Sequence, residues 1–363
     1  GISAYWSDML GTHTIITTAI TGPQIIDTSG VVAYLNSKKR LNWGAALSRI
    51  VYPYPYYSYG TTDFGGETVL VELQDIFRII NYDVSAFASY PLSSAQRVEL
   101  SGGYRYLDFN ETLYTRYYTQ DGYLVYYEKS HPPTIPGFGY GYVSAGLYYD
   151  TGIFGATSPL IGQSYGLGVS PAFGGLNFTS VSVDLRKYII PVKPFTLAFR
   201  ALHLGRYGKD AEDYRMFPLY LGYWDLVRGY DYYSYYSSAS TLDIGRLFGS
   251  KMIVANVELR FPILRLLGLG KGYFGAWPLE AYGFYDAGIA WANTFGNRYY
   301  WGGTTIADVK PWFLNGNRKP LTSAGFGLRT NLFGMLVLGL NYVYPFQDRN
   351  VGWHFQFYIS PGF

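Results

Sequence analysis

Apolar and polar residues alternate along much of this chain with a period of two. The last residues illustrate the pattern, because every second one is apolar: Phe355, Phe357, Ile359, Pro361 and Phe363. Successive side chains of a β-strand point to opposite faces, so this alternation predicts a strand with one apolar face and one polar face. A strand of a transmembrane barrel has this pattern, and so does a half-buried strand of a soluble sheet.

The same period predicts about fifteen strands and no helix of useful length. In chain order, the predicted strands cover 2–8, 13–21, 30–38, 42–54, 78–91, 96–109, 141–151, 163–173, 177–190, 195–205, 251–262, 279–291, 323–331, 335–345 and 353–363. Short turns such as 330–334 alternate with long polar connections such as 293–321, as they do in membrane barrels. Bacterial single-chain barrels have even strand numbers, so we expect one further strand upstream of residue 1. No linker or composition shift interrupts residues 1–363, which predicts a single barrel domain.

Composition favours a transmembrane barrel over a soluble β-sandwich or propeller. The chain has 40 Tyr, 23 Phe, 8 Trp and 44 Gly, and only 15% of its residues are charged. Tyrosine suits the two membrane interfaces, because its ring is apolar while its hydroxyl seeks water. No run approaches the ~18–20 apolar residues of a membrane helix. The predicted fold class is therefore an all-β, antiparallel transmembrane barrel.

Charge and residue types exclude several kinds of partner and site. The net charge is +3 and no basic stripe stands out, so we expect no nucleic-acid partner. The absence of cysteine excludes disulfides, thiolate metal sites and a cysteine nucleophile. The four histidines, which lack metal-ligand spacing, are His13, His131, His203 and His354. We therefore expect no metal, and we also expect no cofactor and no catalytic residues. An enzyme at the barrel rim, using His203, is an alternative that the residue types leave open.

Strand parity turns two carboxylates toward the barrel interior. Glu258 shares a face with Asn256 and Arg260, while the alternate residues are apolar: Val257, Leu259 and Phe261. On the next strand, the residues predicted to face lipid are Tyr285, Ala287, Ile289 and Trp291. Asp286 therefore points inward with Tyr282 and Phe284.

Arg228 is a candidate partner for these two carboxylates. It lies among tyrosines on the long segment just before the two strands. A buried carboxylate needs a partner, and the planar guanidinium group can bridge Glu258 and Asp286 while staying charged. The alternative is that Arg228 is a solvated loop charge and that both carboxylates face water.

Several motifs occur in an order that resembles the BamA/TamA outer-membrane insertase superfamily. They are VRGY at 227–230, VANVELRFP at 254–262, FYDAGIAW at 284–291, the stretch 323–346 and the terminal FQFYISPGF. The resemblance implies a barrel of sixteen strands in the bacterial outer membrane, with the sixth extracellular loop folded into the lumen. It also implies that this chain begins at the second strand, and that a weak seam between the first and last strands is a lateral gate.

The resemblance assigns roles to the VRGY residues. Arg228 would anchor the loop to Glu258 and Asp286, Gly229 would permit a close turn, and Tyr230 would pack against the inner wall. The upstream sequence GYWDL, at 222–226, departs from the small residues usual in the family and leaves the path of the loop open.

The C-terminus carries two further expectations. Phe355, Phe357, Ile359 and the terminal Phe363 resemble the signal by which outer-membrane barrels are recognised for assembly. Pro361 donates no backbone N–H and Gly362 adds no stiffness, so both would weaken pairing of the last strand with the first. A frayed end without further consequence is the alternative.

The resemblance implies a function and partners. The function is assembly, insertion or translocation of β-rich proteins through the seam. The partners are outer-membrane lipids, unfolded barrel or secreted clients, and periplasmic accessory proteins. A periplasmic N-terminal domain is expected in the full protein: POTRA repeats or, because ISAYWSDMLGTHTI resembles barrels that follow one, a TolB-like propeller. The alternative function is a passive channel or a barrel that anchors a periplasmic module.

Overall fold

The computed structural model describes residues 1–231, 240–263, 278–293, 299–300, 304–305 and 310–361. Over these residues the chain is built from β-strands joined by turns, loops and short 3-10 segments. No helix within the described residues is long and apolar enough to cross a membrane. Each of the fifteen predicted strands has a counterpart among the described elements, which agrees with the period-two analysis.

The elements of the first half are β1 (Ile2–Ser7), β2 (His13–Ile20), η1 (Ile25–Asp27), β3 (Ser29–Asn36), β4 (Asn42–Phe64), β5 (Glu67–Pro91), β6 (Gln96–Tyr118), β7 (Leu124–Ser130), β8 (Phe138–Asp150), β9 (Ile153–Phe154) and β10 (Pro159–Gly174). Those of the second half are β11 (Phe178–Val192), β12 (Phe195–Tyr207), β13 (Leu219–Tyr220), η2 (Ile244–Leu247), β14 (Phe248–Gly249), β15 (Lys251–Pro262), β16 (Leu279–Trp291), β17 (Tyr299–Tyr300), β18 (Thr304–Thr305), η4 (Trp312–Leu314), β19 (Leu321–Leu332), β20 (Leu336–Pro345) and β21 (His354–Pro361).

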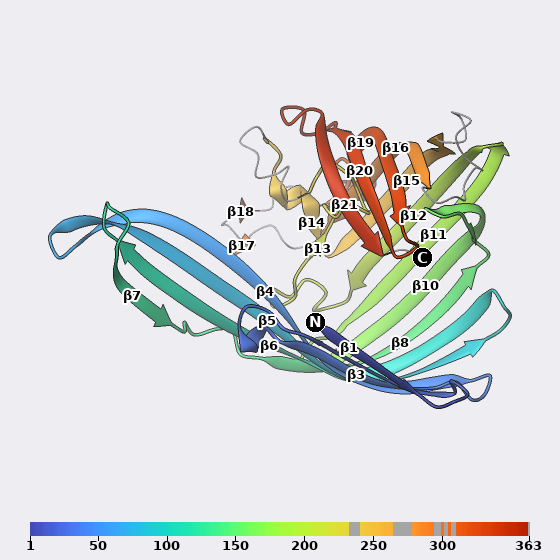
Figure 1. The fold of residues 1–363 in the computed structure, drawn as a ribbon, viewed down its shortest axis with the longest axis horizontal. Helices are drawn as coiled ribbons and strands as arrows, with labels where there is room; N and C mark the ends of the chain where they lie inside the picture. The colour runs from blue at the N-terminus through green and yellow to red at the C-terminus, as the bar shows by residue number, and fades with distance from the viewer. Residues whose placement is uncertain (232–239, 264–277, 294–298, 301–303, 306–309, 362–363) are drawn as a thin grey trace. The chain divides into compact units, whose positions relative to one another are not determined.

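The chain divides into two compact units. Unit 1 holds 1–90, 99–144 and 172–176, and its strands β1 to β5 pair antiparallel in chain order. Unit 2 holds 91–98, 145–171 and 177–363. In unit 2, β11, β12, β15, β16, β19, β20 and β21 form a continuous antiparallel series, whose last strands are red in Figure 1.

The strands of unit 2 have the predicted apolar and polar faces. On β21, Phe355, Phe357 and Ile359 are exposed, whereas Gln356 and Tyr358 between them are buried. The same alternation on β15 exposes Ile253, Val257 and Leu259, whereas Val254, Asn256 and Arg260 on the other face are buried. The exposed face is the one that would meet lipid, because an apolar surface of this extent is rarely left in water.

At the C-terminal end of β16, the burial of the side chains differs from the prediction. Tyr285 is exposed as expected, but Ile289 and Trp291 are buried. The ring of Phe313, from the connection after β16, packs edge-on against Trp291 at 5.5 Å between centroids. Parity alone therefore assigned the wrong surroundings to this end, because a later residue of the connection after β16 folds back against it.

Three strands of unit 1 are longer than predicted. β4, β5 and β6 have 23, 25 and 23 residues, whereas a tilted barrel strand needs ~9–11 to cross the membrane. β7, which pairs with the end of β6, was missed altogether. On the extension of β4 the neighbouring residues Tyr56 and Tyr57 are both exposed, so both of its faces are open there. Without a buried face the alternation disappears, and the period-two signal with it.

Candidate functional site

The polar faces of β15 and β16 form the floor of the candidate site in unit 2. The two strands pair antiparallel, with Asn256 opposite Asp286 and Glu258 opposite Phe284. This register puts Asn256, Glu258 and Asp286 on the face opposite the exposed apolar residues of β15. Both carboxylates therefore point to one side of the sheet, as strand parity predicted.

Arg228 lies on this floor and contacts both carboxylates. Its Nε donates to Asp286 Oδ2 at 2.6 Å, and its Nη2 donates to Asp286 Oδ1 at 2.7 Å. Nη1 donates to Glu258 Oε1 at 2.7 Å. The backbone N–H of Arg228 adds a longer bond to Asp286 Oδ2 at 3.2 Å. The guanidinium group thus makes a two-pronged pair with one carboxylate and a single bond to the other, a geometry specific to arginine.

The pair is buried and its polar groups are satisfied. The side chain of Asp286 has 0% exposure, and Arg228 has 8%. Asn256 Nδ2 donates to Asp286 Oδ1 at 2.8 Å and to the carbonyl of Leu226 at 2.7 Å, so it links the strand to the loop backbone. Burial alone would lower the pKa of Arg228, but the nearby charges of Asp286 and Glu258 outweigh it and raise that pKa. Arg228 therefore stays charged.

Sequence reasoning missed most of a larger ion network around Glu258. Arg260 Nε donates to Glu258 Oε2 at 2.8 Å, and Arg329 Nη2 lies 3.4 Å from the same oxygen. Arg329 Nε also donates to Glu280 Oε1 at 2.7 Å. The parity that selected Glu258 and Asp286 applies equally to Arg260 and Glu280, so part of this network was available to the same reasoning.

The network also holds the connection between β9 and β10. Thr157 Oγ1 and Ser158 Oγ donate to Glu280 Oε2 at 2.9 and 2.8 Å. Arg260 Nη1 donates to the carbonyl of Pro159 at 3.0 Å. Glu280 therefore has hydrogen-bond partners on this connection as well as Arg329. It needs them because its carboxylate is almost completely buried. No sequence signal pointed to Thr157 or Ser158.

Gly229 occupies a position that only glycine fills without strain. Its φ is +84°, a backbone conformation that L side chains rarely adopt. A Cβ atom at this position would lie 2.9 Å from Cγ2 of Val343, a fully buried residue of β20. The close turn expected at Gly229 is therefore present, and the turn brings the loop backbone against the sheet.

We expect Gly229→Ala to destabilise unit 2 more than Gly334→Ala. Gly334 has a similar φ of +75°, but a Cβ atom added to it would have no neighbouring atom within 4 Å. A left-handed alanine costs roughly 1–2 kcal/mol, and overpacking adds about 1–3 kcal/mol only at Gly229. Denaturant titration of the two variants measures the difference. Equal costs would show that Val343 yields and that the close approach is unimportant.

Tyr230 and its neighbours join the loop to a buried apolar cluster. Tyr230 is almost fully buried, and its hydroxyl lies 2.8 Å from the carbonyl of Thr322 and from Gln347 Oε1. Burial raises the pKa of Tyr230 to about 12, so the phenol stays neutral. The cluster consists of Leu202, Leu221, Leu226, Val227, Tyr230, Leu242, Leu247, Met252, Val254, Ala290 and Leu321. The loop therefore supplies apolar surface as well as charge.

The same loop contacts the last strand. The ring of Trp224 stacks on Tyr358 of β21, with centroids 4.4 Å apart and planes 9° from parallel. Gln356 Nε2, also on β21, donates to Asp231 Oδ2 at 2.9 Å. Trp224 belongs to the stretch GYWDL at 222–226, and sequence reasoning assigned it no role.

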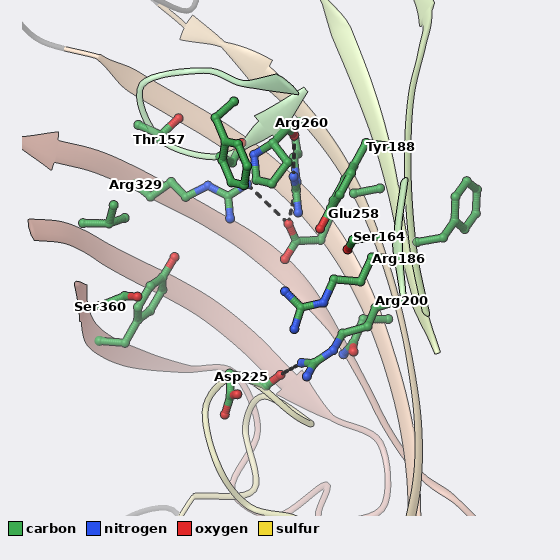
Figure 2. A pocket seen from close by; sticks show the side chains of 18 of the residues that line it. Thr157, Ser164, Arg186, Tyr188, Arg200, Asp225, Glu258, Arg260, Arg329 and Ser360 are labelled. Carbon is green, nitrogen blue, oxygen red and sulfur yellow. Dashed lines mark hydrogen bonds and ion pairs between the residues drawn. The ribbon is translucent and has the colours of Figure 1, made fainter. Parts of the chain in front are cut away.

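A cavity of about 270 Å³ lies beside the anchored arginine. Figure 2 shows Arg186 and Arg200 side by side on its wall, with Glu258 and Arg260 nearby. Arg186 and Arg200 face each other across β11 and β12, and Asp184 Oδ2 accepts from both, at 2.7 and 3.0 Å. Arg200 Nη1 also donates to the carbonyl of Asp225 at 2.9 Å. Five arginines and three acidic residues line the cavity, together with apolar and aromatic side chains such as Phe154, Phe199 and Trp224.

The C-terminal residues are only partly described. Phe355, Phe357 and Ile359 lie on the exposed face of β21, and Pro361 is opposite Leu336 at the end of the β20–β21 pair. Gly362 and Phe363 lie outside the described residues. Among the side chains that the structure describes, no group of three His, Asp or Glu residues is placed to hold a metal ion.

Comparison with known proteins identifies the fold. BamA from Haemophilus ducreyi, in a form lacking POTRA domains 1–3, is similar with a TM-score of 0.52 and 14% identity, over 97% of this chain and 70% of that chain. CdiB from Acinetobacter baumannii has a TM-score of 0.48 and 11% identity, over 99% of this chain and 56% of that chain, a likeness too weak to support a conclusion. No protein-family model and no curated protein matches the sequence. The similarity to BamA confirms the predicted fold class, an all-β, antiparallel transmembrane barrel.

Proposed function

We propose that this chain, which has the fold of a BamA-type outer-membrane barrel, spans the bacterial outer membrane and inserts or translocates β-rich proteins there. The partners in this proposal are membrane lipids, unfolded client proteins and periplasmic accessory proteins. The chain would act without catalysis and without a cofactor. Its driving force would be strand pairing, because an unpaired strand edge is very costly in lipid and an incoming hairpin satisfies it.

The observation that carries the proposal is the anchoring of the β12–β15 loop. Its residues 224–231 contact β15 and β16 through Arg228, and β21 through Trp224 and Asp231. We propose that Arg228, Gly229 and Tyr230 lock this loop with Glu258 and Asp286. The lock would hold the polar face rigid while β21 exchanges partners at a lateral seam. Pro361 and Gly362 would weaken pairing at the end of that strand.

Cross-linking in cells tests this function. A photo-reactive residue at Phe357 in the full-length protein is expected to capture outer-membrane barrel proteins during their assembly. The matched control is Phe326 on β19, which is exposed to a similar degree but has paired strands on both sides. Capture from Phe357 and not from Phe326 supports client handling at the last strand. Equal capture, or none from either, would favour the passive channel or anchoring barrel.

A further inference from the structure

Two neighbouring turns of unit 1 form one surface. Residues 8–12 join β1 to β2, and 37–41 join β3 to β4. The backbone N–H of Ser37 donates to the carbonyl of Thr12 at 2.8 Å, and Ser37 Oγ donates to the carbonyl of Gly11 at 3.2 Å. The two turns are therefore held side by side at one end of the β1–β4 strands.

This surface carries a cluster of positive charge. Lys38, Lys39 and Arg40 are consecutive and exposed. The guanidinium group of Arg40 lies 4.9 Å from the centroid of the Tyr90 ring, so it rests on the aromatic face. The one acidic residue of the two turns, Asp8, accepts hydrogen bonds within its own turn from Thr12 Oγ1 and the His13 N–H.

Apolar side chains flank the cations. Met9 and Leu10 have exposures of 103% and 83%, at the tip of the first turn. Leu41, the last residue of the second turn, and Trp43, near the start of β4, are also exposed. Adjacent exposed apolar side chains are unfavourable in water, and cations beside them are typical of segments that lie in the headgroup layer of a membrane. Trp43 and Tyr90 are the residue types that mark this layer.

We propose that the two turns dock on a leaflet that contains anionic phospholipid. Met9 and Leu10 enter the acyl boundary, while Lys38, Lys39 and Arg40 bind the phosphate groups. An acidic protein would satisfy the charges, but it would leave the exposed apolar tip of Met9 and Leu10 unexplained. The inference rests on the proposed membrane location and not on the lateral seam. It assigns these turns the task of fixing the ends of β1 to β4 at the membrane surface.

Because residues 1–363 contain no cysteine, a thiol introduced among them is the only one in this part of the protein, and any cysteine elsewhere in the full-length protein is replaced by serine. The full-length protein carrying Met9→Cys, labelled with an environment-sensitive fluorophore, is reconstituted into phosphatidylcholine vesicles with and without phosphatidylglycerol. Brominated versions of either lipid then report which one surrounds the label. Heat-modifiable gel mobility shows that the barrel has inserted. We expect quenching by brominated phosphatidylglycerol to exceed quenching by brominated phosphatidylcholine, and the excess to fall as salt rises.

Lys38→Gln/Lys39→Gln tests the charges and leaves the contact of Arg40 with Tyr90 in place. The phosphatidylglycerol enrichment is expected to drop roughly fivefold for each lysine removed. Lys209→Gln, an exposed lysine in unit 2, is the matched control and is expected to change nothing. Equal quenching by both lipids in an inserted barrel would overturn the inference but keep the membrane location, and a chain that never inserts would overturn both. A label that responds to polyglutamate instead of lipid would assign the turns to an acidic protein.

Discussion

Replacing Arg228 with methionine is expected to destabilise unit 2 by roughly 3–5 kcal/mol, the usual cost of removing one partner of a buried ion pair. The substitution keeps the side-chain volume but leaves the carboxylate of Asp286 at 0% exposure without its cation. It also leaves Glu258 with Arg260 and Arg329 only. Denaturant titration of the folded protein in micelles, followed by gel mobility, measures the loss. Limited proteolysis should cut the β12–β15 loop in the variant and spare it in the parent.

Two further variants separate charge from packing. Arg228→Met/Asp286→Asn removes both charges, so it should recover part of the loss, since replacing both partners costs less than stranding one. Arg186→Met breaks the ion pair of Arg186 with Asp184. This pair is more open to solvent, because the side chain of Arg186 is 42% exposed and that of Asp184 is 25% exposed. That control should cost no more than about 1 kcal/mol. If Arg228→Met costs as little as Arg186→Met, the proposed loop lock is wrong.

Replacing Arg78 with methionine is expected to release the β2–β3 connection of unit 1. Arg78 is fully buried, and its Nε donates to Asp27 Oδ1 at 2.6 Å. Its Nη1 donates to Thr112 Oγ1 at 2.8 Å, and its Nη2 donates to Gln24 Oε1 at 3.1 Å. The variant leaves the buried carboxylate of Asp27 unpaired, at a cost of roughly 3–5 kcal/mol. Hydrogen exchange over residues 21–28 should rise.

The Arg78 prediction has its own controls. Arg105→Met breaks a pair with Asp83 in the same unit, but Arg105 is about one-third exposed, so little change is expected. Arg78→Met/Asp27→Asn should restore part of the protection. Exchange within the β12–β15 loop should stay at the parent level, because these contacts lie in unit 1. Unchanged exchange over 21–28 in Arg78→Met would mean that other contacts hold the connection, such as the bond from Arg49 Nη2 to the carbonyl of Ile26.

Arg228 and Arg78 differ in how far the sequence alone predicts their contacts. Arg228 was found because its motif order resembles a family and because strand parity placed Glu258 and Asp286 on one face. Arg78 was missed, since it lies within a run of apolar residues on β5 and its partner Asp27 lies on a connection. Only the fold of that connection against the sheet makes them neighbours, and no periodic pattern encodes it.

The long strands of unit 1 show the same limit. Their membrane-length parts, such as 42–54 of β4, alternate because one face is apolar and the other polar. The outer part of β4, residues 55–64, was missed because exposed tyrosines on both faces remove the alternation. The β7 strand was missed for this reason, although its pairing with β6 is regular over most of its length.

The sequence by itself determined the local consequences of side-chain geometry. A period of two divides each strand into two faces whatever its neighbours are, so the strands of unit 2 and the inward direction of Glu258 and Asp286 followed from it. The tertiary structure alone decided register, loop path and coverage: the stacking of Trp224 on Tyr358, the network from Glu280 to Ser158, and the burial of Trp291. These contacts join residues far apart in the chain, so their energies depend on how elements pack and not on any local pattern.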